Sequence, residues 1–378
     1  MPPSALDRLE LIYRSGPSTA IRSGAGSAPV VGYVGADVPV ELLDAAGVFG
    51  VRLAGDPTAD RSRGDRLLGR GLDPATRSLM SQLVSGQFDG LDALVVSRDC
   101  EASLRLFYAV RELRRVDPGC GLPPVHLLDL LHLPYRTTTT YNLARLTGLR
   151  DWLRAWTGNP VTDDDLARSV LAHGEVREQQ RRVAAYRRGP QARLTGTQAL
   201  AVVGAGTRTP LAAYRSLLGD LLSQLEQGSR PPIGGVATFL TGSSHDNPHV
   251  YAALEAQGVR IVGEDHDWGD LLIDRQVDRP TLLGLAETYQ HQTPTAQRGS
   301  IRDRGVQTAV GLDRSGAQLL VGYLRECDEG PPWDWPEQSR LATQRGVDTI
   351  LLAHQGYGAV DIDTLGTTVA LSTSGGTR

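Results

Sequence analysis

The pattern of apolar and polar positions predicts two similar halves, each built from strands and helices in alternation. The order strand, polar loop, helix, glycine, strand occurs twice, once across residues 29–53 and once across residues 236–262. Gly47 and Gly258 stand where the two helices are expected to end, as glycine often does. Strands and helices that alternate at this spacing are typical of a parallel sheet covered by helices on both faces.

The rest of the chain keeps this plan on either side of a helical segment. Leucines recur every three or four residues from Leu143 to Leu153, which predicts helix rather than strand between the halves. The expected fold class is therefore α/β, with two parallel-sheet half-domains of flavodoxin or Rossmann type and a helical insert. We expect an N-terminal extension, a first α/β domain, a helical segment and a second α/β domain at residues 1–28, 29–140, 141–232 and 233–378.

Two of the three cysteines occupy matching places in the two halves. The apolar run 91–100 ends at Cys100 and the run 317–327 ends at Cys327, and each run is typical of a buried parallel strand. Open α/β sheets bind ligands at the carboxyl ends of their strands. A chain that places two of only three cysteines at this edge is expected to hold a soft metal centre there rather than a disulfide.

Composition and charge exclude several other classes of protein. The net charge is −4 and the pI is near 6.1, so the chain lacks the broad basic surface of a nucleic-acid-binding protein. No apolar segment approaches the roughly 18 residues of a bilayer-spanning helix, and no signal-peptide pattern is present, which predicts a cytoplasmic protein without a membrane partner. All 39 basic residues are arginine, so neither a P-loop lysine nor a Schiff-base lysine is available.

Two further places could contact a substrate. Glu41 opens a predicted helix at the same sheet edge as the cysteines and could touch substrate or carry a proton, although an acid there also compensates the helix dipole. The loop 241–247 precedes a second helix N-terminus, where Ser243, Ser244 and Asn247 could contact a phosphate or thioester oxygen. Asn247 could equally be an ordinary N-cap.

Other features of the sequence give weaker support for a functional site. The acidic run 264–269 is expected to be a solvated loop rather than a metal site. The glycines of 203–208 lack the third glycine of a dinucleotide-binding turn and lie in the helical segment. Cys120 belongs to no motif, and Trp333 and Trp335 could either line a pocket or pack the last helix onto its sheet.

Several stretches together resemble the 2-hydroxyacyl-CoA dehydratase family, whose relatives include subunits of benzoyl-CoA reductase. They run in family order from about residue 29 to residue 360, and their order and spacing are more specific than any one of them. The resembling stretches are 38–47, 72–78, 97–101, 125–129, 194–196, 258–265, 326–329 and 333–336.

The resemblance implies a cofactor and partners. In that family each subunit has two similar αβ domains, and three of its cysteines hold a 4Fe-4S cluster between them. By this resemblance Cys100 and Cys327 match the second and third cluster cysteines. The first should open a Cys-Pro-x-x-Arg-Ser segment, where this chain has Asp73, so the implied metal ligands are Asp73, Cys100 and Cys327. A homologous second subunit, an ATP-dependent activator and an acyl-CoA substrate are the implied partners.

The implied activity is that of a lyase that eliminates water from a 2-hydroxyacyl-CoA through a ketyl radical, as one subunit of a heterodimer. Asp73 leaves other interpretations open, because iron–sulfur clusters are normally held by thiolates. The chain could carry a cluster with mixed ligands, could have lost its cluster and support a partner that keeps one, or could have been repurposed. Ring reduction like that of benzoyl-CoA reductase is also open, since the sequence of one subunit does not separate it from dehydration.

Overall fold

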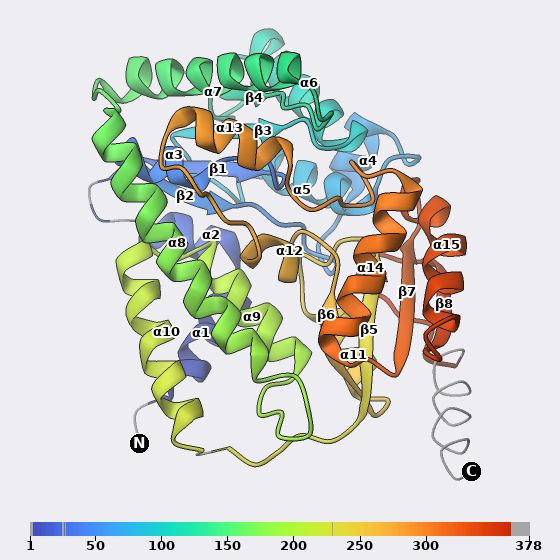
Figure 1. The fold of residues 1–378 in the computed structure, drawn as a ribbon. Helices are drawn as coiled ribbons and strands as arrows, with labels where there is room; N and C mark the ends of the chain where they lie inside the picture. The colour runs from blue at the N-terminus through green and yellow to red at the C-terminus, as the bar shows by residue number, and fades with distance from the viewer. Residues whose placement is uncertain (1–2, 25, 27, 229, 364–378) are drawn as a thin grey trace, which may run out of the picture.

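Two four-stranded parallel sheets form the framework of the chain. The computed structural model describes residues 3–24, 26, 28–228 and 230–363, and helices flank each sheet in it (Figure 1). The first sheet contains β1 (Val30–Val34), β2 (Phe49–Arg52), β3 (Ala93–Ser97) and β4 (Val125–Leu128). The second contains β5 (Val236–Gly242), β6 (Val259–Glu264), β7 (Leu319–Arg325) and β8 (Asp348–Gln355). The predicted α/β class with two similar parallel-sheet halves is therefore confirmed.

Both sheets have the same strand order. It is β2-β1-β3-β4 in the first sheet and β6-β5-β7-β8 in the second, so the strand that follows β1 or β5 in sequence lies on its outer side. The strand order reverses between β1 and β3, and again between β5 and β7, which creates a topological switch point in each half. Open α/β sheets bind ligands at the carboxyl end of such a point. The central strands β3 and β7 are buried along their whole length, as a parallel sheet covered on both faces requires.

Helices cover both faces of the first sheet. One face packs against α2 (Gly16–Ser23), α5 (Pro74–Val84) and α6 (Glu101–Val116), and α4 (Ser62–Leu68) packs beside α5. The other face packs against α3 (Val40–Ala45), α7 (Arg136–Thr157), α8 (Asp163–Ala185) and α13 (Leu282–Gln290). Because α13 comes from the second half of the chain, the two halves share one hydrophobic core at this face.

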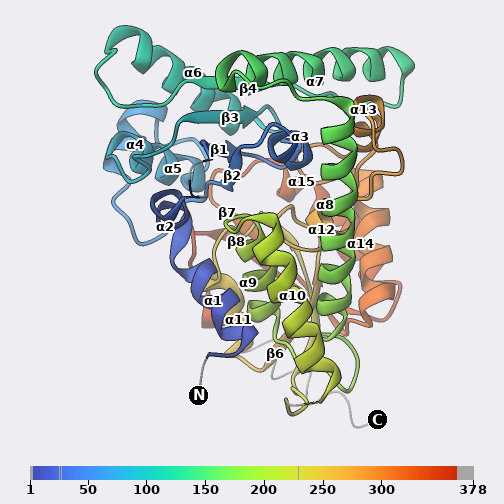
Figure 2. The same cartoon turned by 90° about the vertical axis from the view of Figure 1, so that its left-hand side faces the viewer.

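The second sheet is covered in the same way. One face packs against α1 (Ala5–Arg14), α9 (Gly196–Gly206), α10 (Leu211–Glu226) and α11 (His249–Glu255). The other face packs against α14 (Ile301–Ser315) and α15 (Pro331–Thr343), and the short α12 (Asp270–Ile273) follows β6. Figures 1 and 2 both show α7 lying across the first sheet and α8 descending from it beside α10. The helical segment therefore connects the two sheets along one side of the molecule.

Local sequence signals account for the start of the two helices nearest the cleft between the sheets. Asp73 is the N-cap of α5, where its carboxylate accepts the Ala75 N–H at 3.4 Å and Pro74 takes the first helical position. Cys100 is the N-cap of α6, and its Sγ accepts the Ser103 N–H at 3.4 Å. Two of the predicted metal ligands thus also begin helices.

Two local predictions were wrong. Helix α11 begins one residue later than predicted, with Pro248 as its N-cap, although Asn247 Oδ1 still accepts the His249 N–H at 3.2 Å. The acidic run 264–269 is not a solvated loop, because Glu264 and Asp265 are only 3% and 1% exposed. Both carboxylates face buried arginines that come from distant parts of the sequence.

The structure also bears on the predictions for the glycines of 203–208 and for the two tryptophans. The glycines of 203–208 do lie in helix α9, where Gly204 packs against the Tyr13 ring, so the rejection of a dinucleotide-binding turn is consistent with the fold. Trp335 packs against β7 at Gly322, whereas Trp333 is exposed. Among the described residues, no helix combines the length and the apolar character needed to cross a bilayer. The predicted domain boundaries stay a prediction.

Candidate functional site

A cleft lies where the carboxyl ends of the two sheets meet. It contains a cavity of about 150 Å³ lined by residues of both halves. The first half contributes residues that follow β1 and β3, and the second half contributes residues that follow β5, β6 and β7. The lining includes Gly35, Asp73, Asp99, Cys100, Ser244, Asp267, Arg298 and Arg325. Both topological switch points therefore open onto one cavity, which makes it the candidate site.

The structure brings some of the predicted site residues to this cavity. Asp73, Cys100 and Ser244 line it. Glu41, Ser243, Asn247 and Cys327 are not among its lining residues. Ligand binding by any of these seven residues, inside or outside the cavity lining, stays a prediction.

Asp73 is held by an arginine from the other half of the chain. Arg325 lies at the end of β7, and its Nε and Nη2 donate to the two carboxylate oxygens of Asp73 at 2.7 and 3.0 Å. Arg325 Nη1 also donates to the Ser244 carbonyl at 2.7 Å. Burial alone would lower the pKa of the Arg325 guanidinium, but the neighbouring carboxylates Asp73 and Asp328 outweigh it and raise this pKa. Asp73 is thus half of a bidentate ion pair, the strongest class of such contacts.

Cys100 lies beside Asp99 in an environment that disfavours the thiolate. Burial and, next, the Asp99 carboxylate raise the pKa of the Cys100 thiol to about 12. Burial and then Asp37 raise the pKa of Asp99 as well. Asp99 Oδ2 accepts the Ala36 N–H at 2.8 Å, and its Oδ1 accepts the Ser103 hydroxyl at 2.9 Å. The cavity wall therefore carries a thiol and a carboxyl group whose pKa values are both raised, chiefly by burial.

Cys327 lies outside the cavity lining, two residues after Arg325. Its side chain is exposed, and its Sγ lies 3.7 Å from the carbonyl oxygen of Arg70, which precedes Asp73 in the first half. Its backbone adopts a φ of 59°, a left-handed conformation that residues other than glycine seldom adopt. Cys100, Cys120 and Cys327 are all free thiols.

In this arrangement the residues do not fit a 4Fe-4S cluster. Within the part of the chain that the structure describes, no three His, Cys, Asp or Glu side chains converge so that they could hold a metal ion. Both oxygens of Asp73 are engaged by Arg325, the Cys100 Sγ accepts the Ser103 N–H as part of a helix cap, and Cys327 does not line the cavity. The ligand set Asp73, Cys100 and Cys327 stays a prediction, and this geometry gives it no support.

The predicted substrate loop is tied to the cleft by its own hydrogen bonds. Ser243 is 1% exposed, and its Oγ accepts the backbone N–H of Arg325 at 3.0 Å. The Ser244 hydroxyl faces the cavity and donates to Asp267 Oδ1. Asn247 Nδ2 donates to Asp246 Oδ1 at 2.9 Å. Of the three predicted contacts, Ser244 is the one placed to meet a ligand.

Glu41 occupies a closed internal site. It is fully buried, its Oε1 accepts Arg177 Nη2 at 2.5 Å, and its Oε2 accepts the Tyr289 hydroxyl at 3.1 Å. Burial alone would raise the pKa of Glu41, but the Arg177 guanidinium outweighs it and lowers this pKa to about 2. A carboxylate with both oxygens occupied and so low a pKa is a poor proton carrier near neutral pH.

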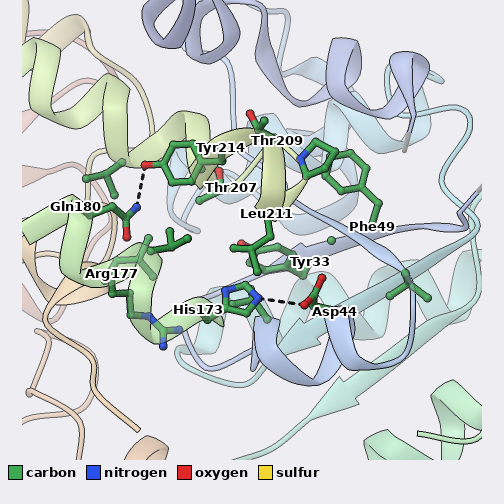
Figure 3. Close-up of a pocket in the computed structure, with 18 of the residues that line it drawn as sticks. Tyr33, Asp44, Phe49, His173, Arg177, Gln180, Thr207, Thr209, Leu211 and Tyr214 are labelled. Carbon is green, nitrogen blue, oxygen red and sulfur yellow. Dashed lines mark hydrogen bonds and ion pairs between the residues drawn. The ribbon is translucent and has the colours of Figure 1, made fainter. Parts of the chain in front are cut away.

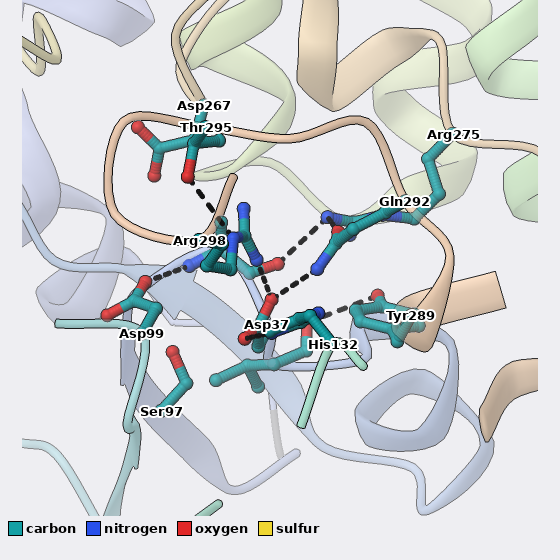
Figure 4. A network of polar contacts seen from close by, with 12 residues as sticks. Asp37, Ser97, Asp99, His132, Asp267, Arg275, Tyr289, Gln292, Thr295 and Arg298 are labelled. Atoms are coloured by element: carbon teal, nitrogen blue, oxygen red, sulfur yellow. Dashed lines mark hydrogen bonds and ion pairs between the residues drawn. The ribbon is translucent and has the colours of Figure 1, made fainter. Parts of the chain in front are cut away.

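A polar network lies beside the cavity (Figure 4). Asp37 is 1% exposed and accepts bonds from Arg298 and Gln292, with His132 Nε2 at 2.9 Å from its Oδ2. Arg52 Nη2 donates to Asp267 Oδ2 at 2.5 Å. Burial opposes ionisation of Asp267, but the Arg52 guanidinium lowers its pKa to about 2.

Sequence reasoning missed most of these charged residues. Arg325 and Asp99 stand within two residues of the predicted Cys327 and Cys100, which was a usable signal. Arg52 and Arg298 carried no comparable signal, because their carboxylate partners lie 215 and 261 residues away along the chain.

A larger cavity lies elsewhere, between the outer strand β2 and the helical segment (Figure 3). Its volume is about 300 Å³, and its lining includes Tyr33, Phe49, Leu211 and Tyr214. Gln180 Nε2 donates to the Tyr214 hydroxyl at 2.9 Å there, whereas His173 Nε2 and Arg177 Nη1 are buried without a hydrogen-bond partner among the described residues. This cavity lies away from both switch points, so we regard the smaller cleft as the functional site despite the difference in volume.

Comparisons with known proteins match this chain to enzymes that act on acyl-CoA thioesters. A family model described as 2-hydroxyglutaryl-CoA dehydratase, D-component, matches residues 36–321. One of the subunits of benzoyl-CoA reductase from Thauera aromatica is 23% identical to this chain over 272 residues, which cover 68% of this chain and 67% of that protein. The region matched by the family model begins two residues after β1, runs into β7 and includes most of the cleft lining.

Proposed function

Because the chain belongs to the family described as 2-hydroxyglutaryl-CoA dehydratase, D-component, we propose that it is one subunit of an enzyme that eliminates water from a 2-hydroxyacyl-CoA. The elimination breaks the bond between C2 and its hydroxyl oxygen and removes a proton from C3. The products are a 2-enoyl-CoA and water, with no net oxidation or reduction. The observation that carries the proposal is the cleft, which joins both switch points of a chain matched over residues 36–321.

The proposal includes a homologous second subunit, an ATP-dependent activator and a cytoplasmic setting. One electron from the activator enters the thioester carbonyl, forms a ketyl radical and leaves again as the product forms, so none is consumed. No step is assigned to a cluster in this chain, because its described cleft residues do not fit one. Free thiols at Cys100, Cys120 and Cys327 suit a reducing compartment.

The residues of this chain would bind the substrate and hold a proton. Ser244 faces the cavity and can accept a hydrogen bond while its own hydroxyl donates to Asp267. Asp99 lines the cavity, and burial and then Asp37 raise its pKa, which favours it as the group that gives a proton to a departing hydroxyl group. These roles need no metal in this chain.

Ring reduction is a second candidate, and the similarity to a protein of benzoyl-CoA reductase favours it. Two electrons and two protons would add to the ring of an aromatic acyl-CoA, and the activator would supply the electrons. The architecture of the cleft serves either reaction, so the choice depends on which substrate is turned over.

The test is an activity assay on the assembled enzyme. The chain is purified anaerobically with its homologous partner and mixed with the activator, ATP and a reductant, and the thioesters are then separated. We expect 2-hydroxyglutaryl-CoA to be consumed and the enoyl-CoA to form. This turnover should be absent when the chain is omitted and should be at least tenfold slower in Asp99→Asn. Consumption of benzoyl-CoA instead would establish the second candidate. Turnover of neither thioester by a complex whose activator hydrolyses ATP would contradict both.

A further inference from the structure

Three arginine–carboxylate ion pairs cross the cleft, and each joins one half of the chain to the other. They are Asp73 with Arg325, Arg52 with Asp267, and Asp37 with Arg298, and we call them the interdomain clasp. The first of each pair comes from the first α/β half and the second from the second half. All three arginines line the cavity.

The clasp is buried and held at several points. The side chains of Arg325, Arg52 and Arg298 are 6%, 3% and 7% exposed. Besides its bidentate bond to Asp73, Arg325 donates to the Ser244 carbonyl at 2.7 Å. Arg52 donates to the Asp267 carbonyl at 2.7 Å as well as to its carboxylate. Bonds to both backbone and side chain fix these two guanidinium groups in one orientation, so the clasp is a built connection and not a set of mobile surface charges.

The Asp73–Arg325 pair stands where the family resemblance would put an iron–sulfur cluster. A cluster there would join the halves through ligands from both of them. We propose that in this chain the interdomain clasp makes that connection instead, and that the chain carries no iron–sulfur cluster of its own. This inference deepens the proposed function and rests on it for the second subunit, which would hold the electron-carrying centre.

The chemistry of each predicted ligand agrees with this inference. For Asp73 to reach iron it would have to leave two charge-assisted bonds and abandon the buried charge of Arg325. Carboxylate is also a harder ligand than the thiolate that iron–sulfur clusters prefer. The Cys100 Sγ accepts the Ser103 N–H as part of a helix cap, and the Cys327 Sγ lies beside the Arg70 carbonyl. Each group therefore has a structural partner without any metal.

The test counts iron in this chain after assembly with its partner. The complex is reconstituted anaerobically with iron and sulfide, its subunits are separated without oxygen, and iron and acid-labile sulfide are measured per chain with EPR as a second readout. We expect no stoichiometric iron in the wild-type chain and no change in Cys100→Ala. About four iron and four sulfide per wild-type chain, lost in Cys100→Ala, would overturn the inference.

Two substitutions at residue 73 test whether the absence of a thiolate at this position is what keeps a cluster out of the chain. Asp73→Cys breaks the pair and restores a thiolate, whereas Asp73→Ser breaks the pair and adds no thiolate. We expect iron to appear in Asp73→Cys and not in Asp73→Ser. If Asp73→Cys stays as empty as the wild type, the missing thiolate is not the reason, and iron in Asp73→Ser would show instead that breaking the ion pair alone admits a cluster. Iron in the wild-type chain would overturn this inference but leave the proposed activity intact. Loss of activity toward both thioesters would contradict the proposed function but leave the iron count and the clasp unaffected. The two failures are therefore distinguishable.

Discussion

The substitution Asp73→Asn should open the cleft locally without unfolding the chain. It removes one charge of the Asp73–Arg325 pair and leaves a side chain of nearly the same shape. The guanidinium of Arg325, whose side chain is only 6% exposed, then keeps its bond to the Ser244 carbonyl and a weak contact of 3.8 Å with Asp328. The remaining partners compensate only part of the lost charge.

The expected cost follows from the burial of the pair. Two charges about 4 Å apart attract by about 4 kcal/mol at an effective dielectric constant of about 20. Removing one partner of a buried pair typically costs about 3–5 kcal/mol. Because Asp73 is 18% exposed and Asp328 remains nearby, we expect the lower end, about 3 kcal/mol. That value corresponds to a roughly 100-fold larger population of the opened cleft.

Hydrogen exchange measured by mass spectrometry on the intact chain is the assay. Amides of β7 and of the first turn of α5 should exchange about 100-fold faster in Asp73→Asn, because opening of the cleft exposes them. Asp313→Asn is the matched control, since Asp313 is 64% exposed and pairs with Arg345 at 3.1 Å on the surface. Loss of such a surface pair should cost no more than about 1 kcal/mol.

A double-mutant cycle with Arg325→Gln separates the pair from its surroundings. If the pair itself holds the cleft, the double variant should be less destabilised than the sum of the single variants, with a coupling of about 2–3 kcal/mol. Exchange in Asp73→Asn that matches the Asp313→Asn control, or a coupling below about 0.5 kcal/mol, would refute the reasoning.

Three further outcomes follow from other contacts. Acid should release the clasp, because the pKa of Asp267 is about 2 in the folded chain against 3.8 for the unperturbed group. The contribution of Asp267 to stability is therefore present above pH 4 and is lost as the pH falls toward 2. The fluorescence of the adjacent Trp268 should change in that range. Glu41→Gln should lower the free energy of unfolding in urea by about 3–5 kcal/mol, because it leaves the buried guanidinium of Arg177 unpaired. Gly242→Ala should lower the midpoint of thermal unfolding, since a Cβ there would lie 2.2 Å from a carbonyl oxygen of β7 and φ is +111°.

The fold could be predicted because its signals are local. Each strand is a short apolar run, and the two glycines that end the first helix of each half stand in equivalent places. The carboxyl ends of β3 and β7 could also be located, because Cys100 and Cys327 follow buried runs of the same character. The shared strand order of the sheets was not predicted, because β2 and β3, like β6 and β7, follow each other along the chain without lying side by side in the sheet.

The charged part of the site could not be predicted, because its partners are far apart in sequence. The 264–269 run is acidic in the way that exposed loops are, and only the arginines of distant segments make its burial possible. Arg187 follows helix α8 and meets Glu264, while Arg304 belongs to α14 and meets Asp265. A carboxylate is stable in such a place only when it is paired, so its burial is decided by the tertiary structure.

The charges of the clasp also bear on how a two-subunit enzyme could divide its work. A cluster and an ion pair can both join two half-domains, but only the cluster accepts an electron. A chain that joins its halves through Arg325 and Asp73 keeps the closed geometry of the cleft and gives up the capacity to carry charge through it. A guanidinium suits this role because its planar fork engages both carboxylate oxygens and it stays charged at any physiological pH. Substrate positioning by Ser244 and proton holding by Asp99 then remain possible in this chain, since neither depends on iron.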